Sequence, residues 1–295
     1  MKKITILSGK GGVGKSSITA SLAAALSKKH RIVAADCDVD ASNLALVLGI
    51  GELKEKKRLS TNQTAEFDLD KCTGCRKCFQ ECYFHAIGWK NNKPRLKQFG
   101  CEGCGVCELV CPANAVKLVN IGNAELGHAK TKYGFPVVSA QLGIGQSGSG
   151  KVVTEVRKMA EEKGKEINAE LMLIDAAAGI GCPVIASVAG VDYVLAVTEP
   201  TPSGFADLKR ALKMVDHFNI PYGLIINRHD INPEKTKEIK EFAGSNNIEI
   251  IYEIPYDKCF VDALVRLMPI IGHEKKYERL FFGIRDKLIN NIKLH

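Results

Sequence analysis

The stretch that decides the fold is Gly9–Ser16, which reads GKGGVGKS. It follows an apolar strand-like segment, residues 4–7, and precedes a segment rich in Ala, Ser and Leu that is typical of a helix, residues 16–29. The pattern GxxxxGK[ST] between a strand and a helix predicts a phosphate-binding loop, because glycines let backbone N–H groups approach phosphates closely. Lys15 is expected to reach the β- and γ-phosphates of a nucleotide, and the Ser16 hydroxyl to bind Mg²⁺.

The rest of the chain alternates apolar strand-like segments with helical ones. Residues 32–35 form a second apolar segment, so the chain opens with the βαβ unit that begins a parallel sheet. Further strands are expected at residues 171–174, 193–197, 223–226 and 248–252, and helices at residues 203–218, 233–243 and 274–294. The predicted fold class is therefore α/β, a P-loop NTPase with a mostly parallel sheet.

A cysteine-rich segment with polar flanks, residues 52–66 and 120–132, interrupts this alternation. It contains the pattern CxxCxxCxxxC twice, beginning at Cys72 and again 29 residues later at Cys101. An inserted domain is the simplest interpretation of this interruption. The expected parts are residues 1–66 and 121–295 for the ATPase domain, and residues 67–120 for a small α+β, bacterial-ferredoxin-like insert.

Each cysteine set has the spacing of bacterial ferredoxins with two [4Fe–4S] clusters, and Pro112 follows the second set as in that pattern. There the first three cysteines of a set bind one cluster and the fourth binds the other. We therefore expect one cluster on Cys72, Cys75, Cys78 and Cys111, and the second on Cys101, Cys104, Cys107 and Cys82. Zinc also binds thiolates, but it favours two separated CxxC pairs, so zinc is the alternative.

Composition limits the class of protein. The 295 residues are 45% hydrophobic and 25% charged, which is ordinary for a globular chain. No apolar run approaches the roughly 18 residues of a membrane span, and the start shows no signal-peptide pattern, so a cytoplasmic location is expected. The net charge of +8 is scattered, and two oxidised clusters with their thiolates would lower it by about 4, so nucleic acid is not an expected partner.

The early lysine, Lys10, makes the loop similar to the deviant Walker A motif of the MinD, ParA and nitrogenase iron protein superfamily. The resemblance implies ATP as the nucleotide and a homodimer that sandwiches it. In such a dimer Lys10 would touch the phosphates bound by the partner subunit. The residues implied to bind the nucleotide in the loop are Gly11, Gly12, Val13, Gly14, Lys15, Ser16 and Ser17.

Three aspartates alternate after residues 32–35, in the sequence ADCDVDASN, at the edge of the sheet where α/β proteins bind ligands. By its position before Asn43, Asp38 resembles the water-positioning aspartate of the family's switch I, and Asp40 is the second candidate. Such a carboxylate orients the attacking water for ATP hydrolysis. Capping of the loop is the alternative for any one of Asp36, Asp38 and Asp40.

The apolar segment LMLID ends at Asp175 and resembles a Walker B element, which implies that Asp175 binds Mg²⁺ through water. The next residues resemble switch II, but Ala177 and Ala178 stand where the family has proline, which puts the hydrolysis rate in question. Asn227 resembles the family's adenine-reading asparagine. Pro255 and Asp257, in IPYD, resemble its second purine-side loop, although any strand-to-helix turn can have this sequence.

Several other features have less certain roles. The sequence GQSGSGK at residues 145–151 lacks a hydroxyl residue after its lysine and is expected to be a loop beside the nucleotide site. Cys182 lies where the nitrogenase iron protein carries a cluster ligand, but a buried free cysteine is expected there, as at Cys37 and Cys259. The apolar stripe of Tyr277, Leu280, Phe281, Ile284, Leu288 and Ile292 is expected in the core, with membrane contact possible but not favoured.

These features together predict an ATPase with slow intrinsic hydrolysis. Nucleotide would close a homodimer, and hydrolysis would be linked to electron transfer through two [4Fe–4S] clusters, or to cluster handling, with an unidentified redox or cluster-accepting protein. The alternatives are an iron-sulfur cluster carrier and a MinD/ParA-like positioning ATPase that acts through partners or membranes.

Overall fold

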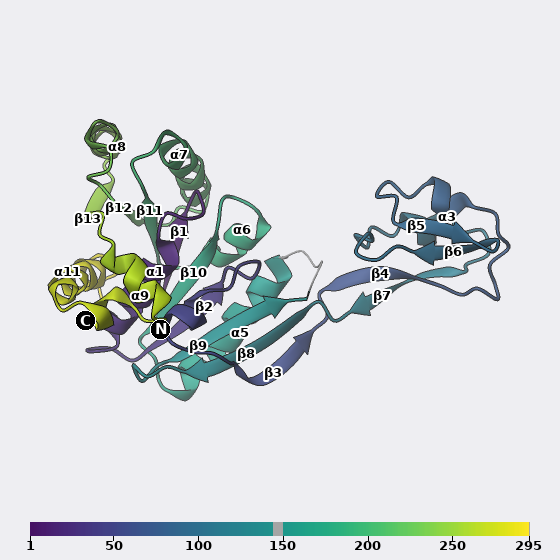
Figure 1. The fold of residues 1–295 in the computed structure, drawn as a ribbon, viewed down its shortest axis with the longest axis horizontal. Coiled ribbons are helices and arrows are strands. Elements are labelled where there is room, and N and C mark those ends of the chain that lie inside the picture. Colours follow the sequence, from purple (N-terminus) through teal and green to yellow (C-terminus); the bar gives the residue numbers. More distant parts are fainter. Residues whose placement is uncertain (144–149, 295) are drawn as a thin grey trace. The chain divides into compact units, whose positions relative to one another are not determined.

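The computed structural model describes residues 1–143 and 150–294, and Figure 1 shows how they form two compact units. The first unit contains Met1–Lys56, Leu126–Gln141 and the chain from residue 150 onward. The second unit contains Lys57–Glu125 and residues 142 and 143. The polar flanks of the cysteine-rich segment are therefore structured: they form strands, and the second unit extends beyond residues 67–120 on both sides.

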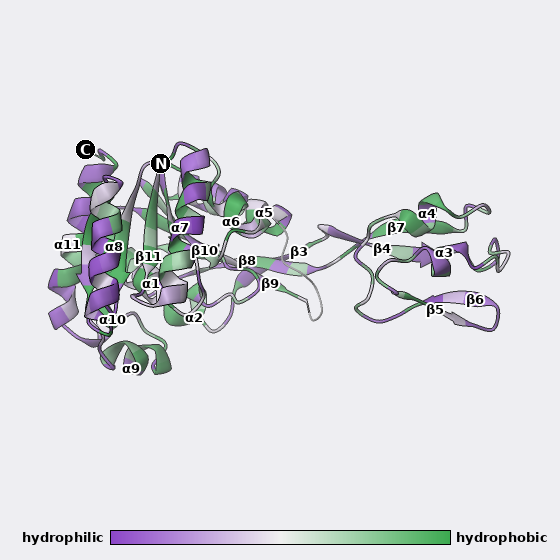
Figure 2. Cartoon of the chain, turned by 90° about the horizontal axis from the view of Figure 1, so that it is seen from above, coloured by the Kyte–Doolittle hydropathy of each residue, from purple (hydrophilic) through white to green (hydrophobic). Residues whose placement is uncertain are grey.

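Within the described residues, one nine-stranded sheet forms the centre of the first unit, in the order β13-β12-β11-β1-β10-β2-β9-β8-β3. The seven strands from β13 to β9 in this order pair in parallel. Their apolar runs are buried on both faces, as parallel strands covered by helices require, and Figure 2 shows the inner strands in green. The bounds are β1 Lys2–Ser8, β2 Ile32–Cys37, β3 Lys54–Leu59, β8 Ala124–Lys130, β9 Pro136–Leu142, β10 Leu171–Ala178, β11 Tyr193–Thr198, β12 Tyr222–Asn227 and β13 Glu249–Ile254.

Helices cover the sheet on both faces. Side chains alternate along β1, so Ile4 and Ile6 pack in the core beneath α1, while the Thr5 hydroxyl on the other face donates to the carbonyl of Ser187 in α6. The helices of this unit are α1 Lys15–Leu26, α2 Leu44–Val47, α5 Gly150–Glu166, α6 Cys182–Val188, α7 Pro202–His217, α8 Pro233–Ser245, α9 Cys259–Val265, α10 Ile270–His273 and α11 Lys276–Asn291. No helix among the described residues is long and apolar enough to cross a bilayer.

The apolar stripe near the C-terminus lies in the core of the first unit. All six of its residues are buried in one cluster with residues of α1, and the Phe281 side chain is fully buried. Arg285, on the same helix, is also buried; its guanidinium stacks on Phe282 and donates to the carbonyl of Ala25 at 3.4 Å. Core packing therefore accounts for the stripe.

The second unit is built twice from the same pieces. Its elements are β4 Asn62–Phe67, α3 Lys77–Gln80, β5 Ile87–Lys90, β6 Lys93–Leu96, α4 Val106–Leu109 and β7 Val116–Ile121. The helices α3 and α4 both begin five residues after the first cysteine of their set, and β5 and β7 both begin ten residues after the helix start. Two antiparallel ribbons result, β4 with β7 and β5 with β6. The repeat seen in the sequence is thus a repeat of structure.

We expect Phe281→Ala to lower the free energy of unfolding of the first unit by about 3–5 kcal/mol, because it leaves a cavity in a fully packed core. Urea denaturation followed by circular dichroism measures this change. Arg279→Ala, at an exposed position on the same helix, is the control and should change stability by less than about 0.5 kcal/mol. Equal effects of the two substitutions would contradict the burial of the stripe.

Candidate functional site

The loop Gly9–Ser16 connects β1 to α1 and leaves space for an anion. Gly12 and Gly14 have φ of +82° and +91°, a conformation that favours glycine, and a side chain at Gly14 would come within 2.5 Å of the Asn227 amide nitrogen. A side chain at Gly11 or Gly12 would meet nothing within 4 Å. The start of α1 has neither a side-chain cap nor an acidic residue, so its backbone N–H groups remain available to phosphate.

Beneath the loop, Lys15 and Asp175 form a buried ion pair. The Lys15 Nζ donates to Asp175 Oδ1 at 2.8 Å and lies 3.9 Å from Asp38 Oδ2. The Thr19 hydroxyl donates to the same Asp175 oxygen at 2.8 Å. Asp175 Oδ2 is buried without a hydrogen-bond partner among the described residues, a state that costs about 1–3 kcal/mol. This oxygen fits a water held by Mg²⁺, and Ser16 is the second residue of the adjacent helix α1.

The three alternating aspartates have different surroundings. Asp36 is fully buried and accepts from the Ser42 hydroxyl at 2.8 Å and the Leu44 amide at 3.0 Å, so Asp36 caps the loop that follows β2. Burial, assisted by the negative charge of Asp175, raises the pKa of Asp36 to about 7. Asp38 is half-buried and faces Lys15; burial raises its pKa and Lys15 opposes the shift. Asp40 is exposed in the turn beyond them.

Lys10 is held by residues of its own chain. Its Nζ lies 3.4 Å from Glu199 Oε1 and 3.2 Å from the Ser203 hydroxyl. Glu199 is buried and also accepts from Arg228 at 2.9 Å. Sequence reasoning missed Glu199. This residue directly follows the apolar strand β11, and a carboxylate at the end of an apolar run is the signal that identified Asp175.

The predicted base-binding residues occupy two neighbouring strand ends. At the end of β12, the Asn227 amide nitrogen donates to the Val13 carbonyl at 2.7 Å, which ties Asn227 to the P-loop. Pro255 follows β13 and is exposed. The Asp257 carboxylate accepts from Lys276 at 2.6 Å and from the Tyr277 hydroxyl at 2.8 Å. The hydrogen bond from Lys276, followed by that from the Cys259 amide, holds the pKa of Asp257 well below its usual range. Asp257 therefore anchors α11.

The segment predicted to be switch II continues the sheet. With alanines at 177 and 178, β10 extends to Ala178, which pairs with Ser8, and the Gly179 amide donates to the Ser8 carbonyl at 3.0 Å. Proline at Ala177 or Ala178 would remove an amide donor from this strand.

The cysteines outside the two sets differ in exposure. The expectation that Cys182 is buried is wrong: it is exposed, because it is the first residue of α6 after a surface loop. Cys37 is buried as expected, and Cys259 is half-buried. Most of the predicted loop at residues 145–151 lies outside the described residues, and its last two residues begin α5.

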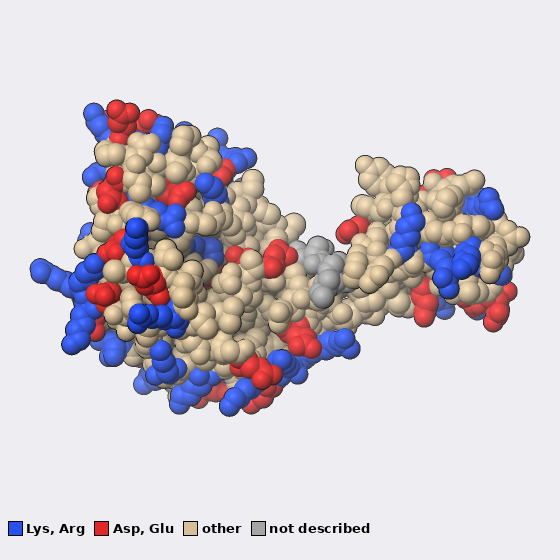
Figure 3. Space-filling view, viewed as in Figure 1, with Lys and Arg blue, Asp and Glu red and all other residues tan. Residues whose placement is uncertain are grey.

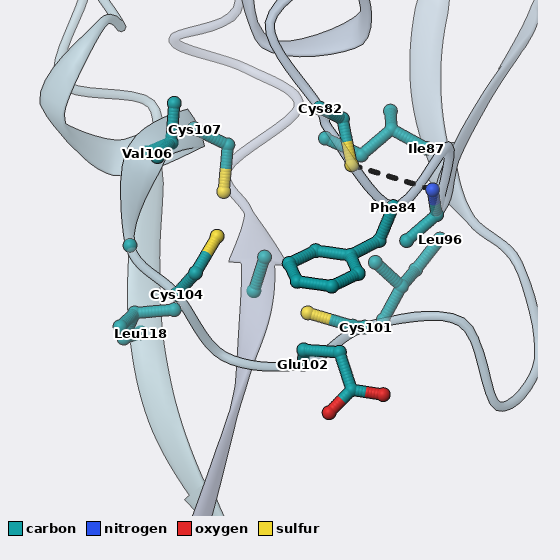
Figure 4. A pocket seen from close by; sticks show the side chains of 13 residues that line it. Cys82, Phe84, Ile87, Leu96, Cys101, Glu102, Cys104, Val106, Cys107 and Leu118 are labelled. Carbon is teal, nitrogen blue, oxygen red and sulfur yellow. Dashed lines mark hydrogen bonds between the residues drawn. The ribbon is translucent and has the colours of Figure 1, made fainter.

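The eight clustered cysteines line two separate cavities of the second unit, four in each. Figure 4 shows the second cavity, where the four sulfur atoms point toward a common space beside the Phe84 ring. The grouping is the one that the sequence pattern predicts: Cys72, Cys75, Cys78 and Cys111 line the first cavity, and Cys82, Cys101, Cys104 and Cys107 the second.

The surroundings of the sulfur atoms suit thiolates bound to a cationic group. The Ala86 amide donates to Cys82 Sγ and the Ala115 amide to Cys111 Sγ, both at 3.3 Å. Burial raises the pKa of Cys107 to about 11, so an uncompensated thiolate is disfavoured there. Among residues 1–143 and 150–294, no three His, Cys, Asp or Glu side chains are gathered closely enough to hold one metal ion. The sulfur atoms surround a space, as a multi-atom cluster requires.

Comparison with known proteins agrees with the fold of the first unit. An uncharacterized protein of Methanocaldococcus jannaschii is 39% identical over 261 residues, which cover 86% of this chain and 84% of that protein. An iron-sulfur cluster carrier protein of Pyrococcus abyssi is 24% identical over 99% of this chain and 86% of its own. The cell division ATPase MinD of Pyrococcus furiosus shares the fold, with a TM-score of 0.60 and 18% identity over 98% of both chains. Residues 4–270 match the CobQ/CobB/MinD/ParA nucleotide binding domain, and the chain belongs to that family.

Proposed function

We propose that this protein is an ATP-hydrolysing dimeric switch with two [4Fe–4S] clusters, which links its nucleotide state to electron transfer or to cluster handling. The observation that carries the proposal is the sorting of eight cysteines into two cavities of four, in a chain whose other unit has a P-loop. The phosphate-binding loop supports the ATPase part, and the cavities support the cluster part.

The residues around the P-loop have distinct roles in this proposal. Gly11–Ser17 bind the phosphates through backbone N–H groups, and Lys15 exchanges Asp175 for the β- and γ-phosphates. Ser16, through its hydroxyl, and Asp175, through its unpartnered oxygen and a water, would hold Mg²⁺. Mg²⁺ supplies charge stabilisation for phosphoryl transfer. Asp38 faces the same space and positions the attacking water, with Asp40 as the second candidate. Asn227, Pro255 and Asp257 are proposed to form the purine side.

Lys10 serves the dimer in this proposal. In the single chain its ammonium group is shared by Glu199 and Ser203, and its side chain is 37% exposed. A triphosphate on a partner subunit carries more negative charge than Glu199, so a second subunit can draw Lys10 away from this contact. Glu199 keeps Arg228 as its partner after Lys10 leaves.

The cysteine cavities fit [4Fe–4S] clusters better than zinc. Each cavity combines three cysteines in tandem from one set with a fourth from the other set, as in two-cluster ferredoxins, whereas zinc favours two separated CxxC pairs. The amide donors to Cys82 and Cys111 match the hydrogen bonds to sulfur that tune cluster potentials. When bound, the clusters supply one-electron redox chemistry, while the apolar residues around the cysteines limit water access.

A cluster carrier is the second candidate, because one cysteine of each set, Cys75 and Cys104, is exposed and accessible to an acceptor protein. A relative in Pyrococcus abyssi has the name of such a carrier. Retention of the clusters during incubation with an apo-acceptor protein and a chelator supports resident redox centres, and their transfer supports the carrier. A membrane-positioning role gains no support from α11, since its apolar stripe is buried.

We expect Asp175→Asn to reduce Mg²⁺-dependent ATP hydrolysis by at least about 100-fold, because the amide cannot hold both Lys15 and the metal-bound water. A phosphate-release assay with and without Mg²⁺ measures this change. Asp192→Asn, before the amino end of β11, is the matched control and should hydrolyse ATP at the wild-type rate. Unchanged hydrolysis in Asp175→Asn would remove Asp175 from the site.

We expect Lys10→Ala to abolish ATP-dependent dimerisation, since the lysine would contact phosphates of the partner subunit. Size-exclusion chromatography with light scattering measures the dimer fraction. Glu199→Gln is the comparison: it weakens the contact that holds Lys10 and should keep or increase the dimer fraction. A Lys10→Ala dimer of wild-type strength would refute the role in trans.

We expect cysteine pairs to separate the two clusters. The wild-type protein, purified without oxygen, should contain about eight irons per chain. The double variant Cys72→Ser with Cys111→Ser affects one cavity and should keep about four irons. The double variant Cys72→Ser with Cys82→Ser affects both and should keep close to none. Equal iron contents in the two double variants would contradict the grouping, and zinc in place of iron would support the alternative metal.

A further inference from the structure

The β5–β6 ribbon lines one side of both cysteine cavities. Cross-strand pairing places Ile87 opposite Leu96 and Trp89 opposite Pro94 on one face. Ile87 and Leu96 line the second cavity, and Trp89 and Pro94 line the first. Because side chains alternate along a strand, Gly88, Lys90, Lys93 and Arg95 belong to the opposite, outer face. One layer of backbone and side chains therefore lies between this outer face and both cavities.

The outer face is strongly basic. Residues 82–101 contain no Asp or Glu, and Lys90, Arg95 and Lys97 are exposed. The side chains of these three form no ion pair or hydrogen bond with any residue that the structure describes. Lys93 differs, because its ammonium group donates to the carbonyls of Leu69 and Cys72 at 2.6 and 2.7 Å. Figure 3 shows blue side chains gathered where Figure 1 draws β5 and β6.

The ribbon is also flat at its centre. Gly88 has no side chain. The three atoms nearest to a Cβ placed at Gly88 would be the Arg95 carbonyl oxygen, at 3.6 Å, and two carbon atoms of the Lys97 side chain, at 3.9 Å. The side chains of Lys90, Arg95 and Lys97 thus surround the area at Gly88, where a partner surface can approach the backbone closely.

The other ribbon of the same unit shows that the scaffold does not require this charge. In the repeat, the pair Gly88 with Arg95 corresponds to the pair Lys117 with Glu66 in β4–β7, where opposite charges face each other. Lys97 corresponds to Asp68, which forms an ion pair with Lys71. The two ribbons have the same architecture, but β4–β7 has balanced charges and β5–β6 has cations whose side chains are unpaired. The cations therefore indicate a binding role.

We propose that the outer face of the β5–β6 ribbon docks an acidic electron-carrier protein. The inference rests on the proposed function, in which both cavities hold clusters. Carboxylates of the partner would pair with Lys90, Arg95 and Lys97, and complementary charge would accelerate and orient the encounter. A partner seated there lies one layer of residues from both clusters. Nucleic acid is the competing occupant, but the free cations cover only one short ribbon, without an extended basic stripe.

The test uses an oxidised, acidic [2Fe–2S] ferredoxin as the probe and the full-length, cluster-loaded protein. We expect binding by calorimetry at low ionic strength that weakens at least about tenfold at 0.3 M salt, roughly as screening requires. The variant Lys90→Glu, Arg95→Glu, Lys97→Glu should bind at least about tenfold more weakly. Carbodiimide cross-links between lysines and ferredoxin carboxylates should map to Lys90 and Lys97.

The control variant is Lys28→Glu, Lys158→Glu, Lys213→Glu, which changes the net charge equally at exposed positions of the first unit. It should bind the ferredoxin like the wild type. Equal weakening in both variants, cross-links confined to other lysines, or binding of a DNA duplex without binding of ferredoxin would each overturn the proposal. A wild-type protein with about eight irons that does not bind ferredoxin overturns this inference alone, whereas a protein without clusters overturns the proposed function as well.

Iron content is measured on every variant. If the variant with three glutamates loses iron, docking is tested instead with the charge-neutralised variant Lys90→Gln, Arg95→Gln, Lys97→Gln. It should keep the iron and bind ferredoxin more weakly than the wild type, and wild-type affinity in this variant would refute the docking surface.

Discussion

The ATPase unit depends on the buried carboxylate of Asp175, of which the described residues provide hydrogen bonds to only one oxygen. Asp175 receives Lys15 and Thr19 on one oxygen, and its second oxygen has no partner among the described residues. A buried charge without a counter-charge would cost several kcal/mol, so Lys15 lies beneath the loop before any nucleotide arrives. Lys15 is the first residue of α1, and its position therefore fixes the turn whose N–H groups receive the phosphates. Burial and the charge of Asp175 also raise the pKa of Asp36, the residue that caps the loop carrying Asp38.

The second unit applies a different constraint, since four sulfur atoms from two halves of the repeat must line each of its two cavities. Short helices and two-stranded ribbons supply the walls, and backbone amides at Ala86 and Ala115 take equivalent positions against Cys82 and Cys111. The two halves share backbone geometry but differ in surface charge, which is the property that the proposed partner would recognise. Architecture and recognition are therefore set by different residues of the same repeat.

Sequence reasoning was most successful where covalent spacing alone determines position. The P-loop and Asp175 follow from strand and helix boundaries, and the grouping of the cysteines follows from their spacing. It was weaker where tertiary packing decides: like Asp175, Glu199 is a carboxylate that closes an apolar run, but it belongs to no motif, and Cys182 is exposed because a surface loop precedes its helix. The polar segment at residues 120–132 gave no strand signal, yet it contains all of β8, because a strand near the sheet edge tolerates residues such as Glu125 and His128.

The exchange of the fourth cysteine between the halves has a consequence for how such a unit is assembled. Cys82 belongs to the first half and lines the cavity of the second, while Cys111 does the reverse. A half on its own would offer three sulfur atoms to its cavity and leave the fourth without a role. Two separate halves would complete their donor sets only by pairing, and joining them in one chain makes that pairing intramolecular.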